Sequence, residues 1–332
     1  MKGISVIVPI LNESIETINR FMLNLCDGIP DDTFEIILFN DGSVKSDGTP
    51  DSPILYESFP PKGYNQLLKI IESRPRKGVG FGLDRMAEQA IGDTIVIAGV
   101  DTLPQKRSWL TGVLNAVKED EIGCPANVGL HDGIYDLNEE GLYIRYGADL
   151  LYTVGVNDLP KNSPLRKNPD YTVLFEGKFA PKRSDQPYEI SCLMGAFYFC
   201  KKSFYERIHG FDTYPGNSYS GHWLYGSLEP YLSLKAKVYG GKCMMYPDMR
   251  VGHQFSRVDP DNLSRAIRPD AHWWNRLFIA HSMLEDSFRD EVLAFPNHEL
   301  NLSLAQVMIK RNWATVQRIR ERNKREGKLI TK

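Results

Sequence analysis

Two residues far apart in the chain, Asp101 and His253, have the side chains best suited to bind a divalent metal ion. Asp101 ends the stretch Gly92-Asp93-Thr94-Ile95-Val96-Ile97-Ala98-Gly99-Val100-Asp101, which is typical of a buried strand that ends in a carboxylate. His253 lies about 150 residues later, in Val251-Gly252-His253. Oxygen ligands suit Mg²⁺ or Mn²⁺, and one imidazole shifts the preference toward Mn²⁺. The pair therefore predicts a divalent-metal site if the fold brings the two side chains together.

Each of the two residues also has a structural interpretation. Asp101 precedes Leu103-Pro104, where a carboxylate commonly caps a helix or closes a turn. A lone histidine such as His253 is often a buried structural imidazole. Catalysis without a metal stays open as an alternative.

The elements that must position these side chains alternate between strand and helix. Apolar, β-branched runs predict strands over residues 4–10, 34–39 and 93–98, and apolar residues at helical spacing predict helices over 12–26 and 81–90. This alternation favours a parallel sheet with right-handed crossovers. Ligands of such sheets bind beyond the carboxyl ends of the strands, where this chain places polar and acidic residues, so the sequence predicts a nucleotide pocket there.

Composition sets the frame for this prediction. The chain has 332 residues, of which 42% are hydrophobic and 25% charged, which is ordinary for a globular protein. Its formal net charge of −2 does not favour binding of a polyanion by the chain as a whole. We find no N-terminal apolar run and no apolar stretch of the length that a membrane span needs. The five cysteines are dispersed, without CxxC spacing, so a reducing, cytoplasmic compartment is expected and a cysteine zinc site is not.

The N-terminal motifs resemble family-2-type glycosyltransferases with the GT-A fold. The opening strand Val6-Ile7-Val8-Pro9 with Asn12-Glu13 resembles the start of that family, and Asn40-Asp41-Gly42-Ser43 resembles its second-strand motif. Gly78-Val79-Gly80-Phe81-Gly82-Leu83-Asp84-Arg85-Met86-Ala87, followed by Gly92-Asp93, resembles the glycine-rich loop and helix that lead to the metal strand.

The resemblance implies specific roles. It makes Asp101 a metal ligand, although Gly99 stands where the family's Asp-x-Asp motif has its first aspartate. It implies contacts to the nucleotide sugar from Pro9, Asn12, Glu13, Asp41, Gly82, Arg85 and Val100. Of these, Asp41 is expected at the uracil or ribose and Arg85 at the diphosphate. From the residues alone, Asp41 also suits an Asx turn, and Arg85 also suits a solvated helix face.

The second half resembles the catalytic domain of polypeptide N-acetylgalactosaminyltransferases. The resemblance rests on Met194 to Phe199, on Gly210-Phe211-Asp212, on Tyr225 to Gly241 and on Val251-Gly252-His253-Gln254-Phe255, whose histidine binds manganese in that branch. It covers roughly residues 4–257. The expected architecture is an α/β GT-A core over 1–257, with a nucleotide-binding half over 1–104 and an acceptor and metal half over 105–257. A loop and a helical C-terminal extension follow over 258–332.

Glu229 is the candidate catalytic base, because it aligns with an acidic position of inverting family members and a carboxylate there can take a proton from an acceptor hydroxyl. Its structural alternative is a first-turn helix carboxylate. The polypeptide transferases retain configuration and need no such base, so stereochemistry stays open. Arg257, in the polar loop after His253, is a candidate diphosphate contact, and His222-Trp223 are candidates for the sugar or acceptor pocket.

The C-terminal helix predicted over 301–326 carries a basic run. Basic tails can contact a polyanion or an anionic membrane surface, although a solvated helix face is the more common explanation. The run consists of Lys310, Arg311, Arg318, Arg320, Arg322, Lys324, Arg325 and Lys328.

Together these features predict a glycosyltransferase, a hexosyl- or N-acetylhexosaminyltransferase, that uses a UDP-sugar and Mn²⁺ or Mg²⁺. The acceptor is expected to be a glycan, a protein or a modified nucleic-acid base, and an oligomer is compatible with the sequence. A nucleotidyltransferase is an alternative, but Leu11-Asn12-Glu13 lacks the basic glycine-rich signature that this class would need. A decayed nucleotide-sugar-binding module is another alternative. It is favoured by Gly99 and by Leu228, which stands where the acidic pair of inverting family members has its first acid.

Overall fold

The computed structural model describes residues 3–27, 34–61, 67–104, 108–130, 144–155, 172–195, 197–213, 227–254, 269–294, 306–307 and 309–332. Arg257, His222 and Trp223 lie outside these residues. The strands are β1 (Ile4–Ile10), β2 (Phe34–Asn40), β3 (Leu67–Glu72), β4 (Thr94–Ala98), β5 (Thr102–Pro104), β6 (Glu121–Gly129), β7 (Ile144–Arg145), β8 (Ala148–Gly155), β9 (Thr172–Phe179), β10 (Tyr188–Ile190), β11 (Phe197–Lys201) and β12 (Lys242–His253). The helices are α1 (Ile15–Cys26), α2 (Val79–Gln89), α3 (Ser108–Ala116), α4 (Lys202–Arg207), α5 (Leu228–Val238), α7 (Pro269–Met283), α8 (Asp286–Leu293) and α10 (Trp313–Arg325), with a short 3₁₀ turn over Pro53–Leu55.

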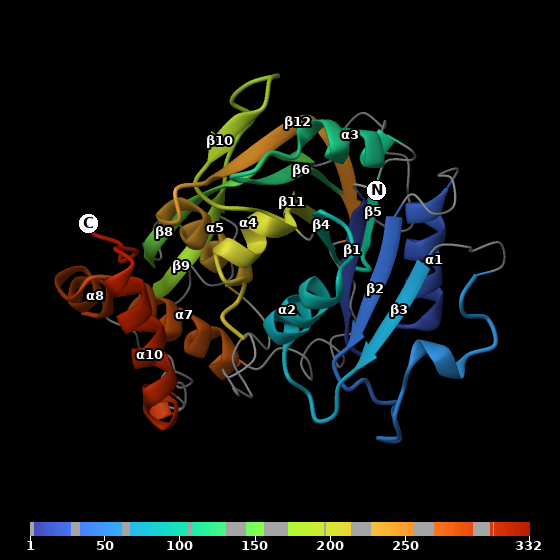
Figure 1. Ribbon diagram of the computed structural model, residues 1–332, viewed down its shortest axis with the longest axis horizontal. Coiled ribbons are helices and arrows are strands. Elements are labelled where there is room, and N and C mark those ends of the chain that lie inside the picture. The colour runs from blue at the N-terminus through green and yellow to red at the C-terminus, as the bar shows by residue number, and fades with distance from the viewer. Residues whose placement is uncertain are drawn as a thin grey trace.

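A large sheet in the order β10-β12-β6-β11-β4-β1-β2-β3 forms the centre of the molecule (Figure 1). Strands β1, β2, β3 and β4 are mutually parallel, and β12 is parallel to β6. Strand β11 runs antiparallel between β4 and β6, so β6 and β12 point the same way as β4. The predicted α/β fold with a mostly parallel central sheet is confirmed.

The two faces of the sheet bury alternate residues of the same strands. Val6 and Val8 of β1 face α1 and α3, whereas Ile7 faces α2. Ser14 caps the start of α1, because its hydroxyl accepts a hydrogen bond from the Thr17 amide at 3.2 Å. Alternate residues of the strands and the apolar residues at helical spacing on the covering helices therefore form one hydrophobic core on each face of the sheet.

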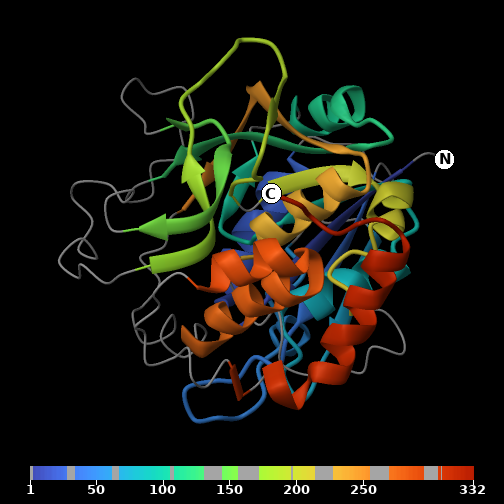
Figure 2. The same cartoon turned by 90° about the vertical axis from the view of Figure 1, so that its left-hand side faces the viewer.

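The C-terminal helices lie at the opposite side of the molecule from α1 (Figure 1) and pack against one another (Figure 2). Trp273 and Trp274 of α7 are fully buried in the same hydrophobic cluster as Ile7 and Leu83. The last residues return to this group, since Ile330 pairs with Leu284. The extension therefore shares the main core.

None of the helices described has the length and apolarity that a membrane span requires.

Candidate functional site

A tight turn and an antiparallel strand pair bring Asp101 and His253 together. After β4, the Thr102 amide donates to the Gly99 carbonyl at 3.1 Å, which reverses the chain into β5. Strand β5 pairs with the end of β12, so that Thr102 lies opposite His253. His253 Nε2 then lies 3.1 Å from Asp101 Oδ2, and the Gln254 amide donates to the Asp101 carbonyl at 2.9 Å.

The pair is compatible with a divalent ion in geometry and in accessibility. Two neighbouring ligands of an octahedral ion with bonds of about 2.1 Å are about 3 Å apart, close to the observed separation. The Asp101 side chain is 39% exposed and the His253 side chain 14%, so a ligand can reach both. Among the residues that the structure describes, no third histidine, cysteine or acid completes a cluster with them. A metal here would depend on the substrate and water for its remaining ligands.

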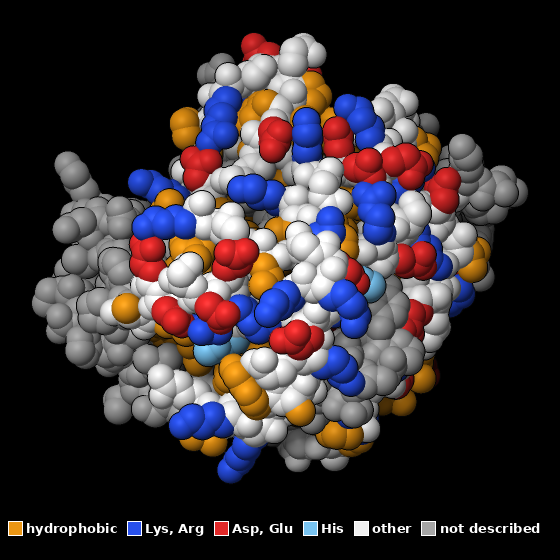
Figure 3. Space-filling view, turned by 60° about the vertical axis from the view of Figure 1, so that its left-hand side comes forward, with side chains coloured by type: hydrophobic (Ala, Val, Ile, Leu, Met, Phe, Trp, Pro, Cys, Tyr) orange, Lys and Arg blue, Asp and Glu red, His pale blue; other side chains and the backbone are white. Residues whose placement is uncertain are grey.

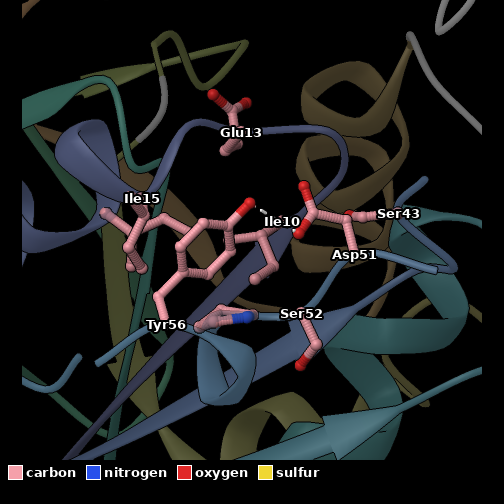
Figure 4. Close-up of a pocket in the computed structure, with 9 residues that line it drawn as sticks. Ile10, Glu13, Ile15, Ser43, Asp51, Ser52 and Tyr56 are labelled. Carbon is pink, nitrogen blue, oxygen red and sulfur yellow. Dashed lines mark hydrogen bonds between the residues drawn. The ribbon is translucent and has the colours of Figure 1, made fainter. Parts of the chain in front are cut away.

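Glu13, at the carboxyl end of β1, is electrostatically coupled to this pair. Glu13 is exposed at the rim, and partial desolvation by its surroundings together with the negative charge of Asp101 raises its pKa to about 7. Glu13 also borders a hollow beyond the ends of β1 and β2, where it stands over Tyr56 with its carboxylate directed away from the ring (Figure 4). The hollow is lined by Ile10, Glu13, Ile15, Ile18, Ser43, Asp51, Ser52, Pro53 and Tyr56.

Asn12 ties the loops that follow β1 and β2 to each other. It has a left-handed backbone with φ of 57°. Its amide donates to Ser43 Oγ at 2.9 Å, and its side-chain oxygen accepts from the Val44 amide at 2.9 Å. Pro9 pairs with Phe39 across β1 and β2, at the same end of the sheet. The rim that the sequence predicts is thus assembled, with Asn12 in a bracing position.

Asp41 joins the end of β2 to the start of α2. Its side chain is 2% exposed, and its carboxylate accepts from the amides of Lys77 at 2.6 Å and Gly78 at 3.0 Å. Burial raises the pKa of Asp41, against these hydrogen bonds and the Arg76 guanidinium at 3.2 Å. The Asx-type turn of this motif is made by Asn40 instead, whose side chain accepts from the Ser43 amide at 3.0 Å. A contact of Asp41 with a uracil or ribose stays a prediction.

Helix α2 presents its two candidate residues, Gly82 and Arg85, in different ways. A Cβ at Gly82 would lie 2.3 Å from the ring of Phe39, so this glycine permits close packing of the helix on β2. Arg85 pairs with Glu88 at 2.6 Å and lies over the Phe81 ring, on the outer face of the helix. Asp84, between them, is fully buried.

Glu229 lies in the first turn of α5, the position that its structural alternative gives it, and its role as a base stays a prediction. Tyr198 Oη donates to its carboxylate at 2.8 Å. Burial raises the pKa of Glu229, the Tyr198 hydrogen bond lowers it, Glu176 raises it, and the positive charge of His253 lowers it. The candidate base and the candidate metal ligand are therefore near enough to interact electrostatically. Val100, by contrast, is buried in the core next to Asp101.

The sequence did not predict a buried group of charged residues at the inner face of α2, opposite the face that carries Arg85. Asp84, Asp212 and Lys235 are almost completely buried, and Arg322 of α10 reaches them from the C-terminal extension. The Gly210-Phe211-Asp212 motif was a signal for this group, but nothing in the sequence indicated its partners.

The basic run, which begins before α10 and ends after it, is divided between the interior and the surface. Arg320 is buried and donates to the carbonyls of His281 and Leu284 at 3.0 and 2.5 Å, and Arg322 points inward. The exposed members are Lys310, Arg311, Arg318, Lys324 and Arg325. On the face shown in Figure 3, basic and acidic side chains are interspersed. A polyanion or membrane contact of this helix stays a prediction that would depend on the exposed members.

Comparison with known proteins agrees with the fold and the motifs. The chain belongs to glycosyl transferase family 2, whose family model matches residues 5–173. It is 26% identical over 259 residues to Probable N-acetylgalactosaminyltransferase 8 of Caenorhabditis elegans, which covers 77% of this chain and 56% of the relative. It is 22% identical over 293 residues to Polypeptide N-acetylgalactosaminyltransferase 11 of Xenopus tropicalis, covering 87% and 44%. The chain spans about half the length of these curated relatives.

A solved structure shows the same fold. The crystal structure of GalNAc-T7 with UDP, GalNAc and Mn²⁺ superimposes with a TM-score of 0.59 and 18% sequence identity, over 93% of this chain and 54% of that one. The GT-A fold and the family that the motifs predicted are both confirmed.

Proposed function

We propose that this chain transfers a sugar from its UDP derivative to an acceptor hydroxyl, with the help of Mn²⁺ or Mg²⁺. The sugar proposed first is N-acetylgalactosamine. Membership of the family supports sugar transfer, and the names of the relatives and the UDP in the GalNAc-T7 structure support this donor. The observation that carries the proposal is the Asp101–His253 pair, which a turn and a strand register assemble at the carboxyl end of β4.

The residues of the chain would divide the work between donor and acceptor. Asp101 and His253 would hold the metal, which neutralises the charge that develops on a departing diphosphate. Asn12 and Asp41 would hold the loops beyond β1 and β2 in place around the nucleotide. Glu13 would contact the donor from the same rim.

Glu229 would act on the acceptor side. A carboxylate with a raised pKa is a better proton acceptor than an ordinary one, and Tyr198 fixes the orientation of this one. If Glu229 is the base, the transfer inverts the anomeric configuration. The acceptor, a protein, a glycan or a modified base, belongs to the same proposal, as does a reducing compartment, which the five free cysteines suit.

Binding and turnover test the proposal separately. Isothermal titration with UDP should give a Kd at least tenfold lower with Mn²⁺ than with EDTA, and Asp101→Ala and His253→Ala should each remove this difference. Asp93→Ala is the matched control, because Asp93 lies just before β4, at the opposite end of the strand from Asp101.

Turnover is then measured as UDP release from a panel of UDP-sugars. We expect UDP-GalNAc to be consumed, and the two site variants to reduce the Mn²⁺-dependent rate at least a hundredfold. Equal metal dependence in wild type and both site variants would refute the metal site. Binding of UDP without consumption of any donor would instead identify a nucleotide-sugar-binding module.

A further inference from the structure

A strained turn over residues 209–213 is the meeting point of three helices. His209 and Asp212 have left-handed backbones, with φ of 60° and 62°, which side chains other than glycine seldom adopt. Gly210 has φ of 43°, and a Cβ there would lie 2.2 Å from Asp84 Oδ1. Such a conformation persists only where its surroundings hold it.

Asp84 of α2 holds the turn from one side. Its carboxylate accepts from the amides of Phe211 and Thr213, each at 2.9 Å, and from Tyr205 Oη at 2.8 Å. Burial raises the pKa of Asp84 to about 6, against these hydrogen bonds. The backbone of the turn is thus fixed to the helix that also carries Arg85.

Asp212 holds the turn from the other side through α5 and α10. Its carboxylate meets Lys235 Nζ at 2.9 Å and Arg322 Nη1 at 2.6 Å, and it accepts from Tyr231 Oη. Burial alone would raise the pKa of Asp212, but the two cations lower it well below its usual value. Lys235 also donates to the Gly210 carbonyl at 2.8 Å.

The charges of this group balance only when α10 contributes. Asp84 and Asp212 carry two negative charges, and Lys235 and Arg322 carry two positive ones. Without Arg322, two buried carboxylates would share one ammonium group, which is unfavourable in a poorly solvated interior.

We propose that Arg322 is a positioning residue for sugar transfer: through Asp212 it fixes Tyr231 and Lys235, and with them helix α5, whose first turn carries Glu229. This inference rests on the proposed function. It gives the C-terminal extension a role in positioning the acceptor side of the site.

Steady-state kinetics with UDP-GalNAc test the inference. Arg322→Met keeps an unbranched apolar side chain in place of the arginine stem and removes the charged guanidinium, and Arg325→Met, an exposed position on the same helix, is the matched control. We expect Arg322→Met to lower kcat for UDP release at least tenfold while the KM for UDP-GalNAc stays within twofold, because the donor site lies on other elements. The control should change neither constant by more than twofold. An Arg322→Met enzyme with the kinetics of the control would refute the proposal.

A double variant separates charge balance from general damage. Asp212→Asn with Arg322→Met leaves Asp84 and Lys235 as a neutral pair, so we expect its kcat to exceed that of Arg322→Met alone by at least threefold. The factor by which the double variant lowers kcat is compared with the factors for Asp212→Asn and Arg322→Met alone. If it equals their product, the two residues act independently and the inference is overturned.

Hydrogen exchange of the Phe211 and Thr213 amides keeps the test independent of turnover. Their exchange should accelerate at least tenfold in Arg322→Met and be unchanged in Arg325→Met, at a temperature where both proteins are folded. If wild type consumes no UDP-sugar, the proposed function fails, and the anchoring by Arg322 is still judged by these two amides. Unchanged exchange would refute the anchoring even in an active enzyme.

Discussion

The N-terminal and C-terminal halves of the molecule position their site residues by different physical means. In the first half, parallel strands end at one rim, and backbone hydrogen bonds brace the loops there through Asn12 and Asp41. In the second half, Glu229 stands on a helix that is fixed by the buried ion pairs of Asp212. Strand ends follow from local sequence patterns, whereas buried charges depend on partners that are distant in the chain. The first half should therefore respond mainly to packing changes and the second mainly to loss of charge.

Asp212→Asn should produce the largest loss of stability. It leaves Lys235 and Arg322 with an uncompensated positive charge, and breaking a buried ion pair typically costs about 3–5 kcal/mol. The control is Asp120→Asn, since the pair of Asp120 with Arg207 is largely exposed and worth at most about 1 kcal/mol. Urea denaturation measures both. Similar losses in the two variants would show that the buried ion pairs of Asp212 stabilise the second half no more than an exposed pair does, which would contradict its expected dependence on buried charge.

Gly82→Ala tests packing in the first half. The added methyl group would overlap the buried ring of Phe39, and overpacking of this kind costs about 1–3 kcal/mol. The same change at Gly112 of α3 should be neutral or stabilising by up to about 1 kcal/mol, because a helical alanine is favoured there and the flexible Met249 side chain can move. Thermal unfolding of the two variants should therefore shift in opposite directions or by clearly different amounts.

Ser14→Ala tests the local rules at their simplest. Loss of a helix N-cap typically costs about 1 kcal/mol, and here it removes the acceptor for the Thr17 amide of α1. Ser14→Asp retains an acceptor and should keep most of the stability. A loss in both variants of equal size would show that the contact of Ser14 with Thr17 is not a cap.

The sequence was sufficient to predict the elements whose patterns are local. The strands at residues 4–10 and 34–39 and the helices that follow them have clear periods, and the acidic and polar residues at the strand ends predicted the rim. Asp101 and His253 could be paired because the motifs around them resemble a known family, while the register of β5 with β12 could not be read from either stretch. Lys235 and Arg322 were invisible as partners of Asp212, because a lysine or arginine on a helix is usually solvated and only the folded chain shows its burial.

The pH dependence of stability gives the smallest and most local test of the site, because Glu13 is exposed and solvent screens its interaction with neighbouring charges. The pKa of Glu13 is raised from 4.5 to about 7, so the folded protein binds a proton between these values that the unfolded chain releases. The free energy of unfolding should accordingly fall as pH rises from about 4.5 to 7, and this contribution should stay constant above that range. Glu13→Gln should remove that part of the slope when unfolding is measured with urea in EDTA, and Glu57→Gln, on the surface, should leave it unchanged. Because Asp101 contributes to the shift, Asp101→Asn should also reduce the slope, which would link the rim of the first half to the metal pair that joins it to the second.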